Sequence, residues 1–134
     1  MPVPHLLIDY SANLEDRIDI AGLCETLRLA AIETGLFPMP GVRVRAIRAD
    51  HVAIADGDPR HGYLDISVRL RAGRAPTAKA EATQALFEAA RRFVAPVMEA
   101  HPLALSLEMR DIDPDLSPKC GSIREFLQLG DADD

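Results

Sequence analysis

The chain has 134 residues, 48% of them hydrophobic and 4% aromatic, which suits one domain with a mainly aliphatic core. Fifteen Lys and Arg residues against twenty-one Asp and Glu residues give a formal net charge of -6, and no basic run follows one face, so nucleic-acid binding is not expected. Cys24 and Cys120 lack metal-ligand spacing, which predicts reduced thiols and no metal site. Without a membrane-spanning run or a signal-peptide pattern, a cytoplasmic protein with no membrane partner is expected.

The first half of the chain predicts a strand, a helix and a second strand. Residues 5–10 are short, apolar and β-prone, and residues 42–48 alternate as a strand does. Between them, Asp19 is placed to cap a helix that begins at Ile20 and ends at Gly35. The apolar residues of this helix recur at helical spacing: Leu23, Leu27, Ala30 and Ala31.

The second half repeats this order after a segment rich in turn formers, residues 56–62. Residues 64–70 alternate strictly between apolar and polar, a helix is expected from about Pro76, and residues 103–109 alternate as the last strand. Pro96 is expected to kink or weaken the last turns of the helix. The predicted buried stripe of this helix consists of Leu86, Phe87, Ala90, Phe93, Val94 and Val97.

These elements predict an α+β fold: two tandem β-α-β units, about residues 4–50 and 62–112, forming a four-stranded sheet with both helices on one face. A short helix is expected at residues 122–125, which have capping-box spacing, and residues 131–134 form an acidic tail. The helix-free face of the sheet suits either a polar subunit interface or a solvated surface. Its expected residues include Asp65, Ser67, Arg69, Arg71, Ala104 and Ser106.

The N-terminal sequence Met1-Pro2-Val3-Pro4 contains two prolines with a possible chemical role. A proline at a free chain end is a secondary amine. Because burial or neighbouring cations lower the pKa of such an amine, it can be neutral near pH 7 and act as a general base. The alternative interpretation is that Pro2 and Pro4 only stiffen the chain end.

A series of short motifs resembles the 5-carboxymethyl-2-hydroxymuconate Δ-isomerases, a family of the tautomerase superfamily. The ordered set extends from Pro4 to Phe126, almost the whole chain, so residues 1–134 are interpreted as a single tautomerase-like domain. The motifs that carry the resemblance are Pro4-His5 with Asp9-Tyr10-Ser11, Thr34 to Pro38, Gly41 to Arg45, Ala55-Asp56-Gly57, Ala72-Gly73-Arg74 and Leu103 to Ser106.

The resemblance implies a homotrimer with active sites near the subunit boundaries and an N-terminal proline as base. It implies a multiply carboxylated dienol substrate, 5-carboxymethyl-2-hydroxymuconate, in homoprotocatechuate (4-hydroxyphenylacetate) catabolism. Arg43 and Arg74 would bind the substrate's carboxylates and polarise the developing oxyanion, and Arg45 is a candidate third contact. The planar guanidinium suits this role because it binds a carboxylate through two charge-assisted hydrogen bonds. No metal or organic cofactor is required.

Each candidate residue also has a plain structural interpretation. Arg43 and Arg45 would line the polar face of a strand. His5 is either a residue that tunes the site or a bystander at the end of a strand. Phe37 either forms an apolar wall beside the amine or anchors its loop to the core. Arg69 and Arg71 are assigned a structural role.

One feature departs from the family pattern. In the family the catalytic proline precedes the histidine as the first residue of the mature chain, whereas here Met1-Pro2-Val3 precedes Pro4. Inside the chain Pro4 has an amide nitrogen that cannot act as a base, and Pro2 would displace the amine by about 6.5 Å. We therefore expect translation to begin at Val3, which leaves Pro4 free after processing. Two alternatives are a tautomerase for another enol acid and a non-catalytic trimeric carboxylate-binding protein.

Overall fold

A computed structural model describes residues 5–127 and contains the predicted elements in the predicted order. The first half consists of β1 (His5–Ser11), α1 (Ile20–Glu33) and β2 (Arg43–Ala49). The second half consists of β3 (Gly62–Arg71), α2 (Pro76–Ala100) and β4 (Leu103–Ile112). Short 3-10 turns occupy Ala12–Leu14, Met39–Gly41, Pro114–Leu116 and Ile123–Phe126.

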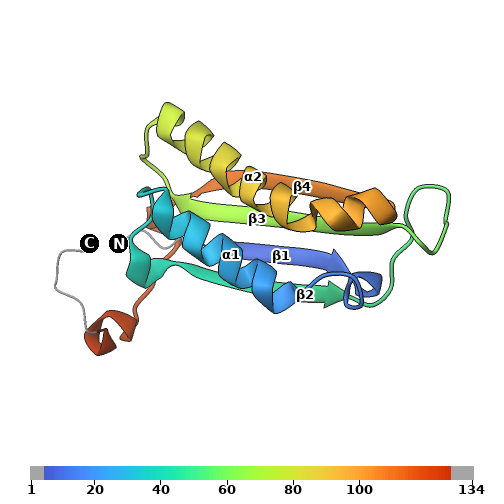
Figure 1. Ribbon diagram of the computed structural model, residues 1–134. Helices are drawn as coiled ribbons and strands as arrows, with labels where there is room; N and C mark the ends of the chain where they lie inside the picture. Colours follow the sequence, from blue (N-terminus) through green and yellow to red (C-terminus); the bar gives the residue numbers. More distant parts are fainter. Residues whose placement is uncertain (1–4, 128–134) are drawn as a thin grey trace.

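The four strands form one mixed sheet with the order β2-β1-β3-β4. The β1-β2 and β3-β4 pairs are parallel, as expected within each β-α-β unit, and the two units meet through the antiparallel pair β1-β3. Figure 1 shows both helices lying across the same face of this sheet. The predicted α+β architecture with its helices on one face is therefore confirmed.

The core lies between this sheet face and the two helices. Alternate residues of β1 and β3 point toward the helices and are buried, and the intervening residues of these strands are more exposed. The two central strands and both helices supply most of the fully buried side chains, among them Ile8, Leu23, Leu27, Leu64, Ile66, Val68, Leu70, Leu86 and Val94. This alternation fixes the register, since a shift by one residue would move the apolar set to the opposite face.

The ends of α1 follow from single residues, as predicted. The Asp19 carboxylate accepts a hydrogen bond from the backbone N–H of Gly22 over 3.0 Å, which satisfies one donor of the first turn. After Glu33, Gly35 adopts a φ of +72°, a left-handed conformation in which a residue with a side chain would be strained. The chain can then turn toward β2.

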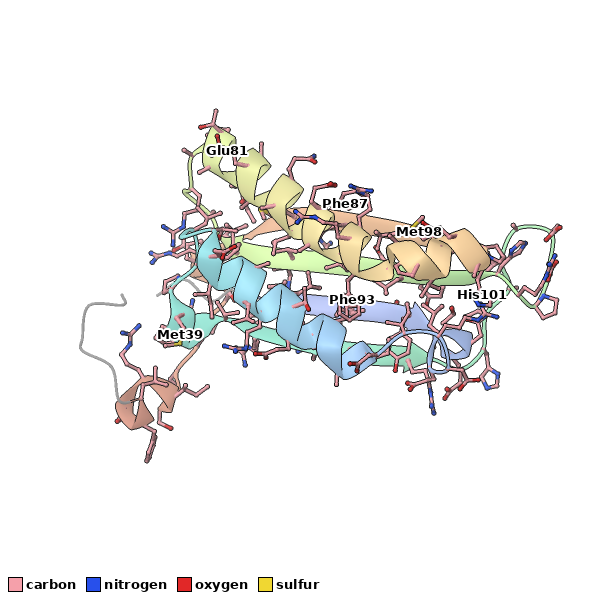
Figure 2. All side chains as sticks on the ribbon, in the orientation of Figure 1. Met39, Glu81, Phe87, Phe93, Met98 and His101 are labelled. Atoms are coloured by element: carbon pink, nitrogen blue, oxygen red, sulfur yellow. The ribbon has the colours of Figure 1, made fainter. Side chains whose placement is uncertain are left out.

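One detail of α2 differs from the prediction, and Pro96 does not end the helix. Phe87 and Phe93 are both half-buried, but only Phe93 packs against the core, where it reaches toward α1 at Gly22 (Figure 2). The helix also continues through Pro96 to Ala100. Because Arg92 and Pro96 are exposed, water can satisfy the Arg92 carbonyl that Pro96 cannot bond, so the helix need not end there.

No helix within the described residues has the length and apolar character needed to cross a membrane.

The C-terminal segment forms a short helical element where one was predicted, but of the 3-10 type. Ile123–Phe126 is a single 3-10 turn, and the Ser122 side chain makes no capping hydrogen bond. Capping-box spacing alone was thus insufficient to place a side-chain cap on this turn. The predicted acidic tail at residues 131–134 lies outside the described residues.

The N-cap of α1 provides a test of this account. We expect Asp19→Ala to lower the free energy of unfolding by about 1 kcal/mol, because the Gly22 N–H loses its partner. Asp19→Asn is the matched control, since its amide oxygen can still accept this bond. Urea unfolding at one fixed protein concentration measures both variants. Equal losses in the two would contradict the capping role.

Candidate active site

The topology brings most of the predicted site residues to one end of the sheet. β1 begins at His5, and its parallel neighbour β2 begins at Arg43. β3 runs antiparallel to β1, so its last residue, Arg71, lies at the same end, and Arg74 follows in the next loop. The C-terminal segment also starts here, because β4 runs parallel to β3. Figure 1 shows this end on the left, where the Met39–Gly41 turn and the C-terminal segment meet the sheet.

The helix-free face of the sheet carries the side chains that alternate with the buried ones. At the end just described these side chains are mostly basic, because His5 pairs in register with Arg43 on one side and with Arg69 on the other. Arg45 is the next residue of β2 on the same face, and it is exposed. The sheet thus concentrates positive charge at the start of β1, although the whole chain is acidic.

His5 lies between two arginines. Its Nε2 atom is 3.0 Å from Nη2 of Arg43, and its Nδ1 atom is 3.0 Å from Nη2 of Arg69. A neutral imidazole has one acceptor nitrogen, so only one of the two guanidinium groups can donate a hydrogen bond to it at a time. The ring brings the two cations close together without neutralising either, and the cluster therefore favours an anion.

The same surroundings favour the neutral form of His5 by lowering its pKa. Burial is the largest cause that lowers its pKa, and nearby positive charges lower it further, in the order Arg43, Arg69, Arg45 and Lys119. A bound carboxylate would offset these charges and raise the pKa of His5. Histidine protonation and anion binding at this end of the sheet are therefore coupled.

Farther along the same face the side chains are acidic. Asp9 lies directly opposite Asp65 in the antiparallel register. The Tyr63 hydroxyl donates a hydrogen bond to Asp9 over 2.7 Å, and the Ser106 hydroxyl donates to Asp65 over 2.7 Å. The bond to Asp9, with burial as a second cause, raises the pKa of Tyr63 to about 12. Because this region repels anions, the basic end is where a carboxylate would bind.

Arg43 and Arg74 line different cavities at the basic end. Arg43 lines one of about 290 Å³ between the start of β2 and the C-terminal segment. Arg74 lines one of about 400 Å³ together with Arg71 and the loop after α1. Gly73, with a φ of +110°, allows the tight turn that places Arg74 beside this loop. One copy of the chain therefore does not bring the two predicted arginines into one pocket.

Of the remaining candidates from the sequence, Phe37 lies in the core, and the two prolines lie outside the described residues. Phe37 is 4% exposed and belongs to the core, as the loop-anchoring interpretation describes. Pro2 and Pro4, the two candidate bases, lie outside the described residues. Their catalytic roles stay predictions.

Sequence reasoning missed four cations near the predicted site: Arg69, Arg71, Lys119 and Arg124. Arg69 and Arg71 were assigned to structure, but Arg69 contacts His5 and Arg71 shares a cavity with Arg74. Lys119 lines the Arg43 cavity. The position of Arg69 beside His5 requires the β1-β3 register, which the alternation of each strand alone does not give. No sequence signal indicated Lys119.

A further cavity of about 510 Å³ lies between the two helices, and none of the predicted site residues lines it. Its charged lining consists of one carboxylate, Glu33, and one guanidinium, Arg92, so it lacks the concentration of positive charge found at the sheet end. Among residues 5–127, no group of three His, Cys, Asp or Glu side chains could hold a metal ion.

The sheet order, the position of the helices and the basic end define a tautomerase-like α+β protein. The chain belongs to the 5-carboxymethyl-2-hydroxymuconate isomerase family, which residues 4–127 match. It is 30% identical over 126 residues to the 5-carboxymethyl-2-hydroxymuconate Delta-isomerase of Escherichia coli, covering 94% of this chain and 100% of that protein. The predicted enzyme class, an isomerase, is thereby confirmed.

Solved structures agree with this assignment. A 5-carboxymethyl-2-hydroxymuconate delta-isomerase superposes with a TM-score of 0.87 at 28% identity, covering 96% of this chain and 95% of that chain. A 5-carboxymethyl-2-hydroxymuconate isomerase from Deinococcus radiodurans R1 superposes with a TM-score of 0.85 at 28% identity, covering 91% of this chain and 92% of that chain. A fused 4-OT symmetric trimer, at 22% identity and a TM-score of 0.59 over 81% of this chain and 85% of that chain, shares the fold.

The environment of His5 can be tested by NMR. We expect the ring to titrate below the ordinary histidine value of about 6.5, because burial and the surrounding cations oppose its protonation. Arg69→Gln should raise this pKa by removing one positive charge, and Arg28→Gln on the exposed face of α1 should leave it unchanged. A His5 pKa at or above 6.5 in the unmodified protein would contradict the arrangement described.

Proposed function

We propose that this protein isomerises 5-carboxymethyl-2-hydroxymuconate, moving a proton from its enol oxygen to a carbon several bonds away, with the Pro4 amine as the base. The observation that carries this proposal is the basic cluster at the start of β1, where His5 lies between Arg43 and Arg69. Pro4 is bonded to His5, so a free Pro4 amine would belong to the same end of the sheet. The family names support the choice of substrate.

The proposed reaction needs one base and several fixed cations. The neutral amine accepts the proton of the enol O–H group, which leaves a dienolate and a protonated amine. The N–H bond then breaks as this proton moves to the distant carbon, and the neutral amine is restored. The nearby positive charges favour the neutral amine before the reaction and stabilise the dienolate during it.

The positions of the two predicted arginines favour a site shared between copies. Arg43 and Arg74 line separate cavities in one chain, so a substrate that touches both would bridge these cavities or lie between subunits. The fused 4-OT structure is a symmetric trimer, and such an assembly of this chain would allow the substrate to lie between subunits. The polar helix-free face is then the expected subunit interface. A role in homoprotocatechuate catabolism and a cytoplasmic location are part of the same proposal.

The second candidate function is carboxylate binding without turnover. The basic cluster favours it equally, since binding an anion requires no free amine. Turnover of another enol acid is a further possibility within the tautomerase class. Activity measurements with defined N-termini separate these functions.

The base is tested with three forms of the chain: one that begins at Met1, one whose first residue is Pro4, and that second form with Pro4→Ala. Mass spectrometry first establishes the N-terminus of each form. We then expect the form that begins at Pro4 to isomerise the hydroxymuconate, a reaction measured by the change in the substrate's ultraviolet absorbance. Blocking the amine by the preceding residues should lower the rate by roughly 10²–10⁴-fold, the usual contribution of a general base. The Pro4→Ala variant should have a lower rate than the form that begins at Pro4, because the substitution replaces the secondary amine of proline with a primary amine.

Full activity in a form whose Pro4 nitrogen is still an amide would eliminate Pro4 as the base. Activity with Pro2 shown to be the first residue would assign that role to Pro2. Carboxylate binding without turnover in all three forms would favour the second candidate function.

The arginines give a separate test. Arg43→Gln and Arg74→Gln should each lower kcat/KM by about 10²–10³-fold, because each removes a positive charge that is expected to stabilise the dienolate. Arg28→Gln is the matched control, since its guanidinium pairs with Glu25 on the exposed face of α1. Steady-state kinetics on the form that begins at Pro4 provides the measurement. Arg43 and Arg74 variants as active as the control would remove these residues from the mechanism.

A further inference from the structure

The Arg43 cavity has two walls from distant parts of the sequence. One wall consists of residues 40–43 at the start of β2, and the other comes from the C-terminal segment. Three cations line it, Arg43, Lys119 and Arg124, and its described lining contains no acidic side chain. A cavity of about 290 Å³ with positive charge on both walls fits a small ligand that carries negative charge at two points.

The two lysines of the chain have different surroundings. Lys79 on α2 donates to the Asp111 carboxylate of β4 over 3.2 Å, so its charge has a partner within the protein. Lys119 is exposed and shares its cavity with two other positive side chains. Burial and three arginines are the larger causes that lower the pKa of His5 at the start of β1, and Lys119 adds the smallest contribution.

We infer that Lys119 binds one carboxylate of a dicarboxylate ligand whose other carboxylate lies on Arg43. This inference rests on the proposed function for the class of ligand, and it adds a specificity-determining residue from outside both β-α-β units. The two cations suit different tasks. The planar guanidinium of Arg43 fixes one carboxylate through two hydrogen bonds, and the flexible lysine follows the other as ligand length varies.

Calorimetry with adipate, an unreactive six-carbon dicarboxylate, tests this inference independently of turnover. Hexanoate is the matched ligand with a single carboxylate, and Lys79→Gln is the matched variant. Lys119→Gln should weaken adipate binding roughly five- to tenfold, as expected for one lost charge-assisted contact, and change hexanoate binding less than twofold. Lys119→Arg should keep most of the adipate affinity. Equal adipate affinities for Lys119→Gln and Lys79→Gln would overturn the inference.

The two cysteines provide a second readout in the unmodified protein. Cys120 lines the same cavity, whereas Cys24 is half-buried on α1 away from it. Adipate should slow the reaction of Cys120 with a thiol reagent and leave that of Cys24 unchanged, as measured by peptide mass mapping. Labelling of Cys120 that is insensitive to saturating adipate would contradict the inference. If adipate binds through Lys119 but no isomerisation occurs, the subsite remains and the proposed reaction fails.

Discussion

The antiparallel pairing of β1 with β3 is the constraint on which the rest of the structure depends. It joins two β-α-β units into one sheet and places His5 opposite Arg69, while the parallel neighbour places Arg43 on the other side of the ring. Buried Ile8, Leu64 and Ile66 fix this register, because a shift by one residue would expose the core face of both strands. The packing of the core thus determines the geometry of the basic cluster.

This register also separates charge along the helix-free face. The end that carries the N-terminal residue of β1 is basic, and the region around Asp9 and Asp65 is acidic. An approaching polycarboxylate is attracted to the first region and repelled by the second, so the sheet orients the ligand as well as binding it. The net charge of -6 gives no indication of this separation into a basic and an acidic region, because it sums the charges of the whole chain.

The sequence predicted the elements well because each has a local signal: strict alternation in residues 64–70, the Asp19 cap, and Gly35 after α1. It predicted Arg43 and Arg74 through a family resemblance, and the structure places both at the basic end. The resemblance could not supply Arg69 and Lys119. Their positions depend on strand register and on where the C-terminal segment packs, and neither is a property of short sequence windows.

A crystal structure tests the central claim, that the basic end of the sheet is the active site, most directly. The crystals would contain the chain that begins at Pro4 and a non-isomerisable analogue of 5-carboxymethyl-2-hydroxymuconate. We expect the analogue's carboxylates to lie within hydrogen-bond distance of Arg43 and Arg74, from one copy or from neighbouring copies. An analogue bound in the cavity between α1 and α2, with the basic end empty, would contradict it.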